Sequence, residues 1–220
     1  ITYLVVAGTS SAREEALPSG LNAPCVMHEI DNALRDDNSL SKGDVDGDSS
    51  TDLRRAALQA MKKAAFFYRR EVARHGGYVY YYSVDLEKRW GEGRAAPYTI
   101  FVQPPGTPTV GMAYLEAYAA TDDGFYLEAA RDAAMALVNG QLESGGWAQK
   151  IHFARPERGR FGKYRKRGGG SWNFSSLDDG QTQAALQMLI RNDKALKYKH
   201  AEINEAAMYG LDALLKAQFP

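Results

Sequence analysis

Apolar side chains recur at helical spacing in five stretches of the chain. In the first, from Asp52 to about Arg74, they follow one another at intervals of three or four residues, which places them on one face of an amphipathic helix. This apolar line consists of Leu58, Met61, Ala65, Tyr68 and Val72. The same pattern predicts helices over 109–120, 124–142, 179–191 and 202–218. We therefore expect an all-α fold.

Small residues, mainly Ala and Gly, occupy much of the apolar face of each predicted helix. Small side chains let helix axes approach closely, which is typical of helices that pack in layers against one another. The apolar pattern begins only after residue 50. The polar stretch before it, rich in Asp, Ser, Gly and Asn, indicates a leader or linker over 1–50 and a helical domain over 51–220.

An internal repeat organises the helices into hairpins. The first helix ends in Gly76-Gly77-Tyr78 and the third in Gly145-Gly146-Trp147, a shift of 69 positions, and the same shift aligns Gly111 with Gly180. Such a unit is a pair of helices joined by a long loop, and it predicts either an open solenoid or a closed ring. We favour the ring, an incomplete (α/α) toroid that is truncated at its C-terminus, with its long connecting loops at one mouth.

The composition indicates a globular domain, with 45% hydrophobic and 25% charged residues. Lys plus Arg equals Asp plus Glu at 27 each, so net charge favours no class of partner. The single cysteine, Cys25, excludes an internal disulfide and any site made of several cysteines. No apolar run is long enough to cross a membrane.

The first twelve residues form a short apolar run that ends in small residues. This pattern fits the end of a signal peptide, or else a short strand or tail. The first interpretation predicts a secreted or periplasmic protein.

Candidate chemistry gathers in the connection from Gly145 to Gln183. Asp178 and Asp179 stand where a helix begins, and they are hard oxygen ligands that suit Ca²⁺. The alternative is that they cap the helix, where a carboxylate satisfies free N–H groups and favours the helix dipole. Trp172 and Asn173, just before them, are well placed to contact a ligand, whereas Trp147 would either stack on a ligand or fill the core.

A basic loop precedes these acids, and aromatic residues are interleaved within it. Its cations are Arg155, Arg158, Arg160, Lys163, Arg165, Lys166 and Arg167. Guanidinium groups pair with uronate carboxylates through two bonds at a time, so the loop suits a polyuronate. The same composition would suit a phosphate backbone, or would simply be solvated. We assign substrate binding to Arg158, Arg160, Lys163 and Arg165.

Three motifs resemble the family 10 pectate lyases. They are Gly145-Gly-Trp-Ala-Gln149, Leu177-Asp-Asp-Gly-Gln-Thr-Gln183 and Leu214-Leu-Lys-Ala-Gln-Phe-Pro220, in the order in which that family carries them. The resemblance covers roughly 53–220. It implies an (α/α) toroid that cleaves polygalacturonate by β-elimination with calcium. This chain has Ala148 where the family usually has Pro, and Gln181 where it usually has Ala. The family's second acidic segment and the arginine expected to act as base would lie past Pro220.

The sequence therefore predicts a calcium-dependent, pectate lyase-like protein that acts on polygalacturonate, with Asp178 and Asp179 as metal ligands. The alternative is a non-catalytic helical-repeat module that binds an acidic glycan or a protein partner. We expect a monomer, with neither nucleic acid nor a membrane as partner.

Overall fold

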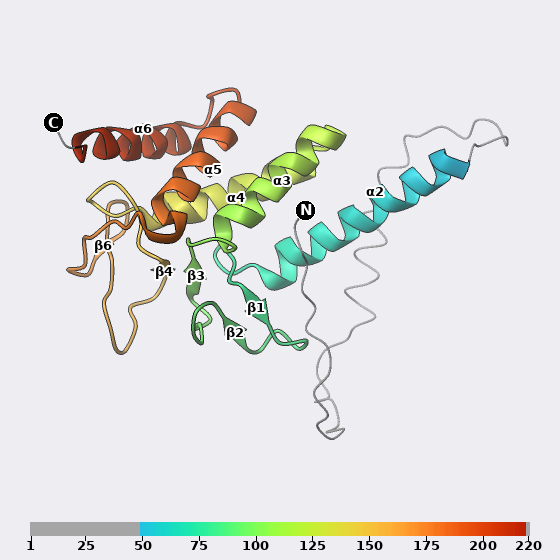
Figure 1. Ribbon diagram of the computed structural model, residues 1–220. Coiled ribbons are helices and arrows are strands. Elements are labelled where there is room, and N and C mark those ends of the chain that lie inside the picture. Colours follow the sequence, from blue (N-terminus) through green and yellow to red (C-terminus); the bar gives the residue numbers. More distant parts are fainter. Residues whose placement is uncertain (1–48, 219–220) are drawn as a thin grey trace, which may run out of the picture. The chain divides into compact units, whose positions relative to one another are not determined.

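The computed structural model describes residues 49–218 and is mostly helical there (Figure 1). The chain divides into two compact units, residues 1–59 and 60–220. Of the first unit the structure describes only the beginning of one helix. The predicted signal remnant at 1–12, nearly all of the leader at 1–50, and Cys25 lie outside the described residues.

All five predicted helices are confirmed, with ends that differ by a few residues from the predicted ones. They are α2(Ser49–Phe67), which continues as a π-helical turn over Tyr68–Val72, α3(Thr107–Thr121), α4(Gly124–Gly140), α5(Gln181–Ala195) and α6(Ala201–Lys216). A 3-10 turn, Asp178–Gly180, precedes α5. The described strands are short antiparallel pairs: β1(Tyr81–Tyr82) with β2(Arg89–Trp90), β3(Thr99–Phe101) with β4(Lys150–His152), and β5(Lys163–Tyr164) with β6(Gly168–Gly169).

The helices of the second unit stack as hairpins in two layers. α3 packs against α4 and α5, and α6 packs against α5 and α4. Gly111 lies where α3 meets α5, and a Cβ atom there would come within 2.3 Å of the Met188 Cε. Gly111 therefore makes room for the Met188 side chain at this crossing, and a larger residue would require that side chain to shift. Closure of such hairpins into a toroid stays a prediction.

The two long connections meet at one end of these helices. β3 belongs to the connection between α2 and α3, β4 belongs to the connection between α4 and α5, and the two strands pair with Thr99 opposite His152. Figure 1 shows β1, β2, β3 and β4 together beside the start of α3. The two long connections are therefore joined through β3 and β4, while their place at the mouth of a ring stays a prediction.

A threonine hydroxyl fixes each of these connections to the helix that follows it. The Tyr78 backbone N–H donates to Thr107 Oγ1 (3.0 Å), and the same hydroxyl donates to the Tyr78 carbonyl oxygen (3.3 Å). The Trp147 backbone N–H donates to Thr182 Oγ1 (3.1 Å), whose hydroxyl lies 3.4 Å from the Trp147 carbonyl. Both aromatic rings and both threonines are buried. The predicted repeat of Gly-Gly-aromatic turns is thus present in the structure.

The repeat does not keep one shift throughout. Tyr78 and Trp147 are 69 positions apart, but Thr107 and Thr182 are 75 apart. The alignment of Gly111 with Gly180 is therefore wrong, because the second connection is six residues longer than the first. When Thr107 is aligned with Thr182, Asp178 in the second connection aligns with Gln103 in the first.

We expect Thr182→Val and Thr107→Val each to lower the free energy of unfolding by about 1–3 kcal/mol, because valine keeps the shape but leaves the backbone N–H of the buried Trp147 or Tyr78 unpaired. Denaturant unfolding would measure both. Thr109→Val, at a half-buried position on α3 whose hydroxyl makes no hydrogen bond with the described residues, should change stability by less than about 0.5 kcal/mol. A small effect at Thr182 and a large one at Thr107 would show that the two clamps are not equivalent.

Candidate functional site

A cavity of about 530 Å³ opens beside the basic loop and the start of α5. Its lining contains four basic side chains, Lys150, His152, Arg158 and Arg160, and no Asp or Glu. The remaining lining residues are Leu142, Ala148, Gln149, Gly159, Gly162, Tyr164, Trp172, Phe174, Ser176 and Gln181. Cationic walls around a concave site attract an anion and strengthen its binding.

Aromatic rings form part of the same wall. The Arg160 guanidinium lies 3.8 Å from the centre of the Trp172 ring, and the Trp172 and Phe174 rings are 4.8 Å apart. Phe174 is 67% exposed, so it offers a ring face to a ligand. Trp172 therefore lies where the sequence predicted a binding residue, and its contact with Arg160 orients a cation at the cavity.

The basic loop is divided into two parts with different roles. Arg158 and Arg160 line the cavity, and both are exposed. Lys163 pairs instead with Glu143 (2.7 Å), and Lys166 pairs with Glu205 (3.2 Å). The cations of the second part are therefore neutralised by carboxylates and lie outside the cavity lining.

Arg165 and Arg167 hold the loop in place. Arg165 forms a two-bond ion pair with Glu205, and its guanidinium lies 4.4 Å from the centre of the Tyr209 ring. Arg167 donates to the carbonyls of Asn139 (2.8 Å) and His152 (2.9 Å). Both Lys163 and Arg165 are thus held in contacts within the protein and lie outside the cavity lining, and their binding of substrate stays a prediction.

His152 adds a neutral group to the cavity. Its Nδ1 lies 3.0 Å from Thr99 Oγ1, on the facing strand. Burial lowers the pKa of His152 below its ordinary value, and the charges of Lys150 and Arg167 lower it further. The imidazole is therefore uncharged near neutral pH and can accept a proton.

A network of amides joins four segments at the edge of the cavity. The carboxylate of Glu92 accepts from Gln103 Nε2 (2.6 Å) and from Gln149 Nε2. The side-chain oxygen of Gln103, Oε1, accepts in turn from Gln149 Nε2 (2.9 Å) and from Gln181 Nε2 (3.4 Å). Gln103 and Gln181 are buried, while Gln149 and Gln181 line the cavity. This network positions the amide groups on one side of the site.

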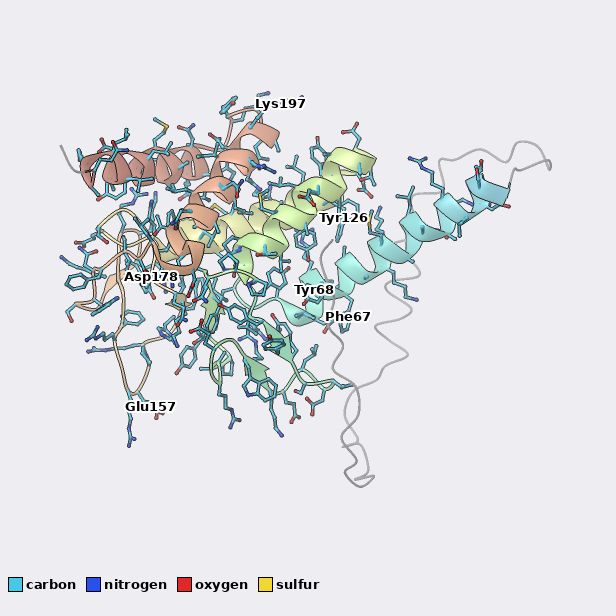
Figure 2. The ribbon with its side chains drawn as sticks, in the orientation of Figure 1. Phe67, Tyr68, Tyr126, Glu157, Asp178 and Lys197 are labelled. Atoms are coloured by element: carbon cyan, nitrogen blue, oxygen red, sulfur yellow. The ribbon has the colours of Figure 1, made fainter. Side chains whose placement is uncertain are left out.

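Asp178 and Asp179 lie in the exposed 3-10 turn before α5 (Figure 2). The Ser176 hydroxyl accepts from the Asp178 backbone N–H (3.1 Å), whereas neither carboxylate accepts a hydrogen bond among the described residues, so capping by these carboxylates is not observed there. Asp179 has a left-handed backbone, with φ 48°. Burial raises the pKa of Tyr80, and the charges of Glu92 and Asp179 raise it further.

Two other predicted residues have structural roles. Trp147 is fully buried, and its ring N–H donates to the Leu137 carbonyl (2.8 Å). The ring is part of the core, which corrects the prediction that Trp147 contacts substrate. Asn173 accepts from the Ser144 backbone N–H (2.7 Å) and does not line the cavity. It ties the two ends of the connection together.

Sequence patterns did not point to several of the residues that form the site. Lys150 and His152 flank the apolar Ile151 shortly after the Gly-Gly-Trp turn, and strand alternation there could have indicated that these two share a surface. Gln149 carries no such signal, because it stands next to Lys150. Glu92 and Gln103 carry no signal in the sequence, because they come from a different connection.

The described residues contain no group of three or more His, Cys, Asp or Glu side chains arranged to hold a metal ion. Asp178 and Asp179 fit calcium only as a pair of free carboxylates, since Ca²⁺ takes six to eight oxygen ligands. The other oxygens would have to come from a ligand or from water. Within residues 49–218, no helix is long and apolar enough to cross a bilayer.

Two solved structures are similar to this chain. One is a family 10 polysaccharide lyase from Cellvibrio cellulosa, with 20% identity and a TM-score of 0.46 over 80% of this chain and 53% of that chain. The other is a mutant of a family 10 polysaccharide lyase from the same organism in complex with trigalacturonic acid, with 20% identity and a TM-score of 0.43 over 74% of this chain and 51% of that chain. The chain spans about half the length of these lyases. No family model and no curated protein matches it.

We expect the contact between the basic loop and α6 to depend on pH through Glu205. The hydrogen bond from Arg165, aided by Lys166, lowers the pKa of Glu205 from its ordinary value of 4.5 to about 2. A depressed pKa gives stability that is present above pH 4.5 and is lost as pH falls toward 2. Glu205→Gln should therefore lower the melting temperature at pH 7 and have a smaller effect near pH 2.

The effect at pH 7 should be less than about 1 kcal/mol, because the pair is partly exposed. Glu202→Gln is the matched control, since its carboxylate lies 3.8 Å from Lys166 and has no other described partner. It should change the melting temperature less than Glu205→Gln does. An equal effect of Glu205→Gln at both pH values would contradict the proposed ion pair.

Proposed function

We propose that this protein binds the acidic polysaccharide polygalacturonate in the cavity beside Trp172 and cleaves it by calcium-dependent β-elimination. The observation that carries the proposal is the lining of the cavity, which combines four basic side chains with the three aromatic rings of Tyr164, Trp172 and Phe174 and contains no carboxylate. An acidic sugar chain offers carboxylates for the cations and flat sugar faces for the rings. A neutral glycan would leave the cations without partners.

In this proposal Arg158 and Arg160 pair with uronate carboxylates. A guanidinium can donate two parallel hydrogen bonds to one carboxylate, which fixes the orientation of the sugar as well as binding it. Lys150 adds a third cation, and its ammonium lies 5.4 Å from the centre of the Phe101 ring. Phe174 supplies the exposed ring face on which a sugar can stack.

Calcium is proposed to bind at Asp178 and Asp179. Their carboxylates are exposed and accept no hydrogen bond that competes with a metal among the described residues. A uronate carboxylate of the substrate would complete the set of oxygen ligands. When bound, the ion neutralises this carboxylate and so makes the neighbouring C5 proton more acidic.

The elimination transfers the C5 proton to a base and breaks the bond between C4 and its glycosidic oxygen, so that a double bond forms between C4 and C5. The departing oxygen keeps the electron pair of the broken bond and takes up a proton from water. Of the groups that line the cavity, His152 is suited to take up the proton, because its lowered pKa keeps the imidazole neutral. Arg158 and Arg160 would hold the substrate while this occurs. The alternative function is a non-catalytic module that binds the same acidic glycan and releases no product.

We expect Arg160→Gln to weaken the binding of polygalacturonate by about tenfold, because it removes a charge-assisted contact at the cavity wall. Isothermal titration calorimetry with a defined oligogalacturonate would measure this. Arg191→Gln, an exposed position on α5 outside the cavity, should leave the affinity unchanged. Tighter binding of duplex DNA than of oligogalacturonate, with a steep dependence on salt, would instead favour a phosphate backbone as ligand.

We expect the protein to release unsaturated uronides from polygalacturonate when calcium is present, and Asp178→Asn to reduce the rate by about a hundredfold or more, because it removes a charged ligand of the ion. The ultraviolet absorbance of the new double bond measures the product. Asp212→Asn, on the exposed face of α6, is the matched control. Binding without product would support the non-catalytic module, and product formation that survives a calcium chelator would contradict the role of the metal.

A further inference from the structure

Gln181 has a buried hydrogen-bond acceptor without a partner. Its side chain is 5% exposed and lines the cavity, and among the described residues its carbonyl oxygen accepts no hydrogen bond. Buried polar atoms in proteins are nearly always paired, and an unpaired one costs free energy. This oxygen therefore lacks a donor at a place where a ligand would bind.

The orientation of the Gln181 amide follows from Glu92. A carboxylate can only accept hydrogen bonds, so the Gln103 side chain must direct its NH₂ group to Glu92 and its oxygen to Gln181. Gln181 must then donate to that oxygen. Its own carbonyl oxygen is consequently the atom left free, and the chain of contacts from Glu92 decides this assignment.

The same reasoning applies to Gln149. Its NH₂ group donates to Glu92 and to the Gln103 oxygen, and no described group donates to its carbonyl oxygen. Gln149 also lines the cavity. Gln149 thus uses both of its N–H donors within the network and Gln181 uses one, and the carbonyl oxygens of both amides are available to a ligand in a cavity that also contains Lys150, Arg158 and Arg160.

A ligand that satisfies both sets of groups carries an anion and a hydrogen-bond donor close together. A uronic acid has this combination, because ring hydroxyls lie next to its carboxylate. The phosphodiester backbone of DNA or a simple polycarboxylate supplies the anion but no hydroxyl beside it. The cations alone would accept all three of these polyanions.

We propose that Gln181 is a specificity-determining residue that accepts a hydrogen bond from a free sugar hydroxyl, so that the cavity selects hydroxylated uronates from other polyanions. Gln103 and Glu92 act as positioning residues for it. This inference rests on the proposed binding of polygalacturonate and names the feature of the substrate that is recognised. The family that the sequence resembles usually has Ala at this position, so the selectivity would be particular to this chain.

The experiment compares two polymers of carboxylates, polygalacturonate and polyacrylate, at equal ionic strength. Gln181→Met keeps the length of the side chain and removes the acceptor. We expect it to weaken the binding of polygalacturonate by about fivefold to tenfold and that of polyacrylate by less than about twofold. Gln187→Met, an exposed position on the same helix, should change neither affinity.

An equal loss for both polymers, or no loss for either, would overturn the inference while leaving the proposed binding of polygalacturonate in place. Wild-type protein that binds neither polymer would overturn both. A second measurement uses wild-type protein and so does not depend on the folding of a variant. Acetylation of the sugar hydroxyls at O2 and O3 should weaken binding by at least about fivefold, and unchanged affinity would also overturn the role of Gln181.

Discussion

The clamp between a threonine hydroxyl and the backbone of a buried aromatic residue is the contact on which the rest of the described structure depends. Thr182 holds Trp147, and Thr107 holds Tyr78, at both the N–H and the C=O of the peptide unit. Each clamp fixes the beginning of a long connection to the beginning of the helix that ends it. The connection must then loop out and return at the same end of the hairpin, which is why β3 and β4 can pair.

The helices and the turns that end them could be predicted from the sequence, because apolar periodicity and Gly-Gly-aromatic motifs are local signals. The change in the distance between equivalent residues of the repeat, from 69 to 75 positions, could not be predicted, because it arises from the length of a loop that has no periodicity of its own. The position of Trp172 and of Asp178 within one connection was also accessible. The amide network was not, because Glu92 and Gln103 reach the site only after the two connections have paired.

The basic loop shows why charge counted along a sequence is a poor guide to charge at a site. Seven cations lie close together in the chain, but Glu143 and Glu205 neutralise three of them from elements that are distant in sequence. These ion pairs fix one end of the loop and leave Arg158 and Arg160 at the cavity. The balance of 27 positive and 27 negative residues in the whole chain hides this separation.

The Glu92 carboxylate accepts hydrogen bonds from the amides of Gln103 and Gln149 at the edge of the cavity. This carboxylate is absent from the cavity lining, so it does not cancel the cationic wall, yet it decides which end of each neighbouring amide is free. Coulombic attraction between cations and a polyanion weakens as salt is added, whereas a hydrogen bond to an amide oxygen is much less affected. A site that uses both can attract its ligand through charge and discriminate through the amides. Selectivity among polyanions would therefore be greatest at high ionic strength, where the contribution that all polyanions share is weakest.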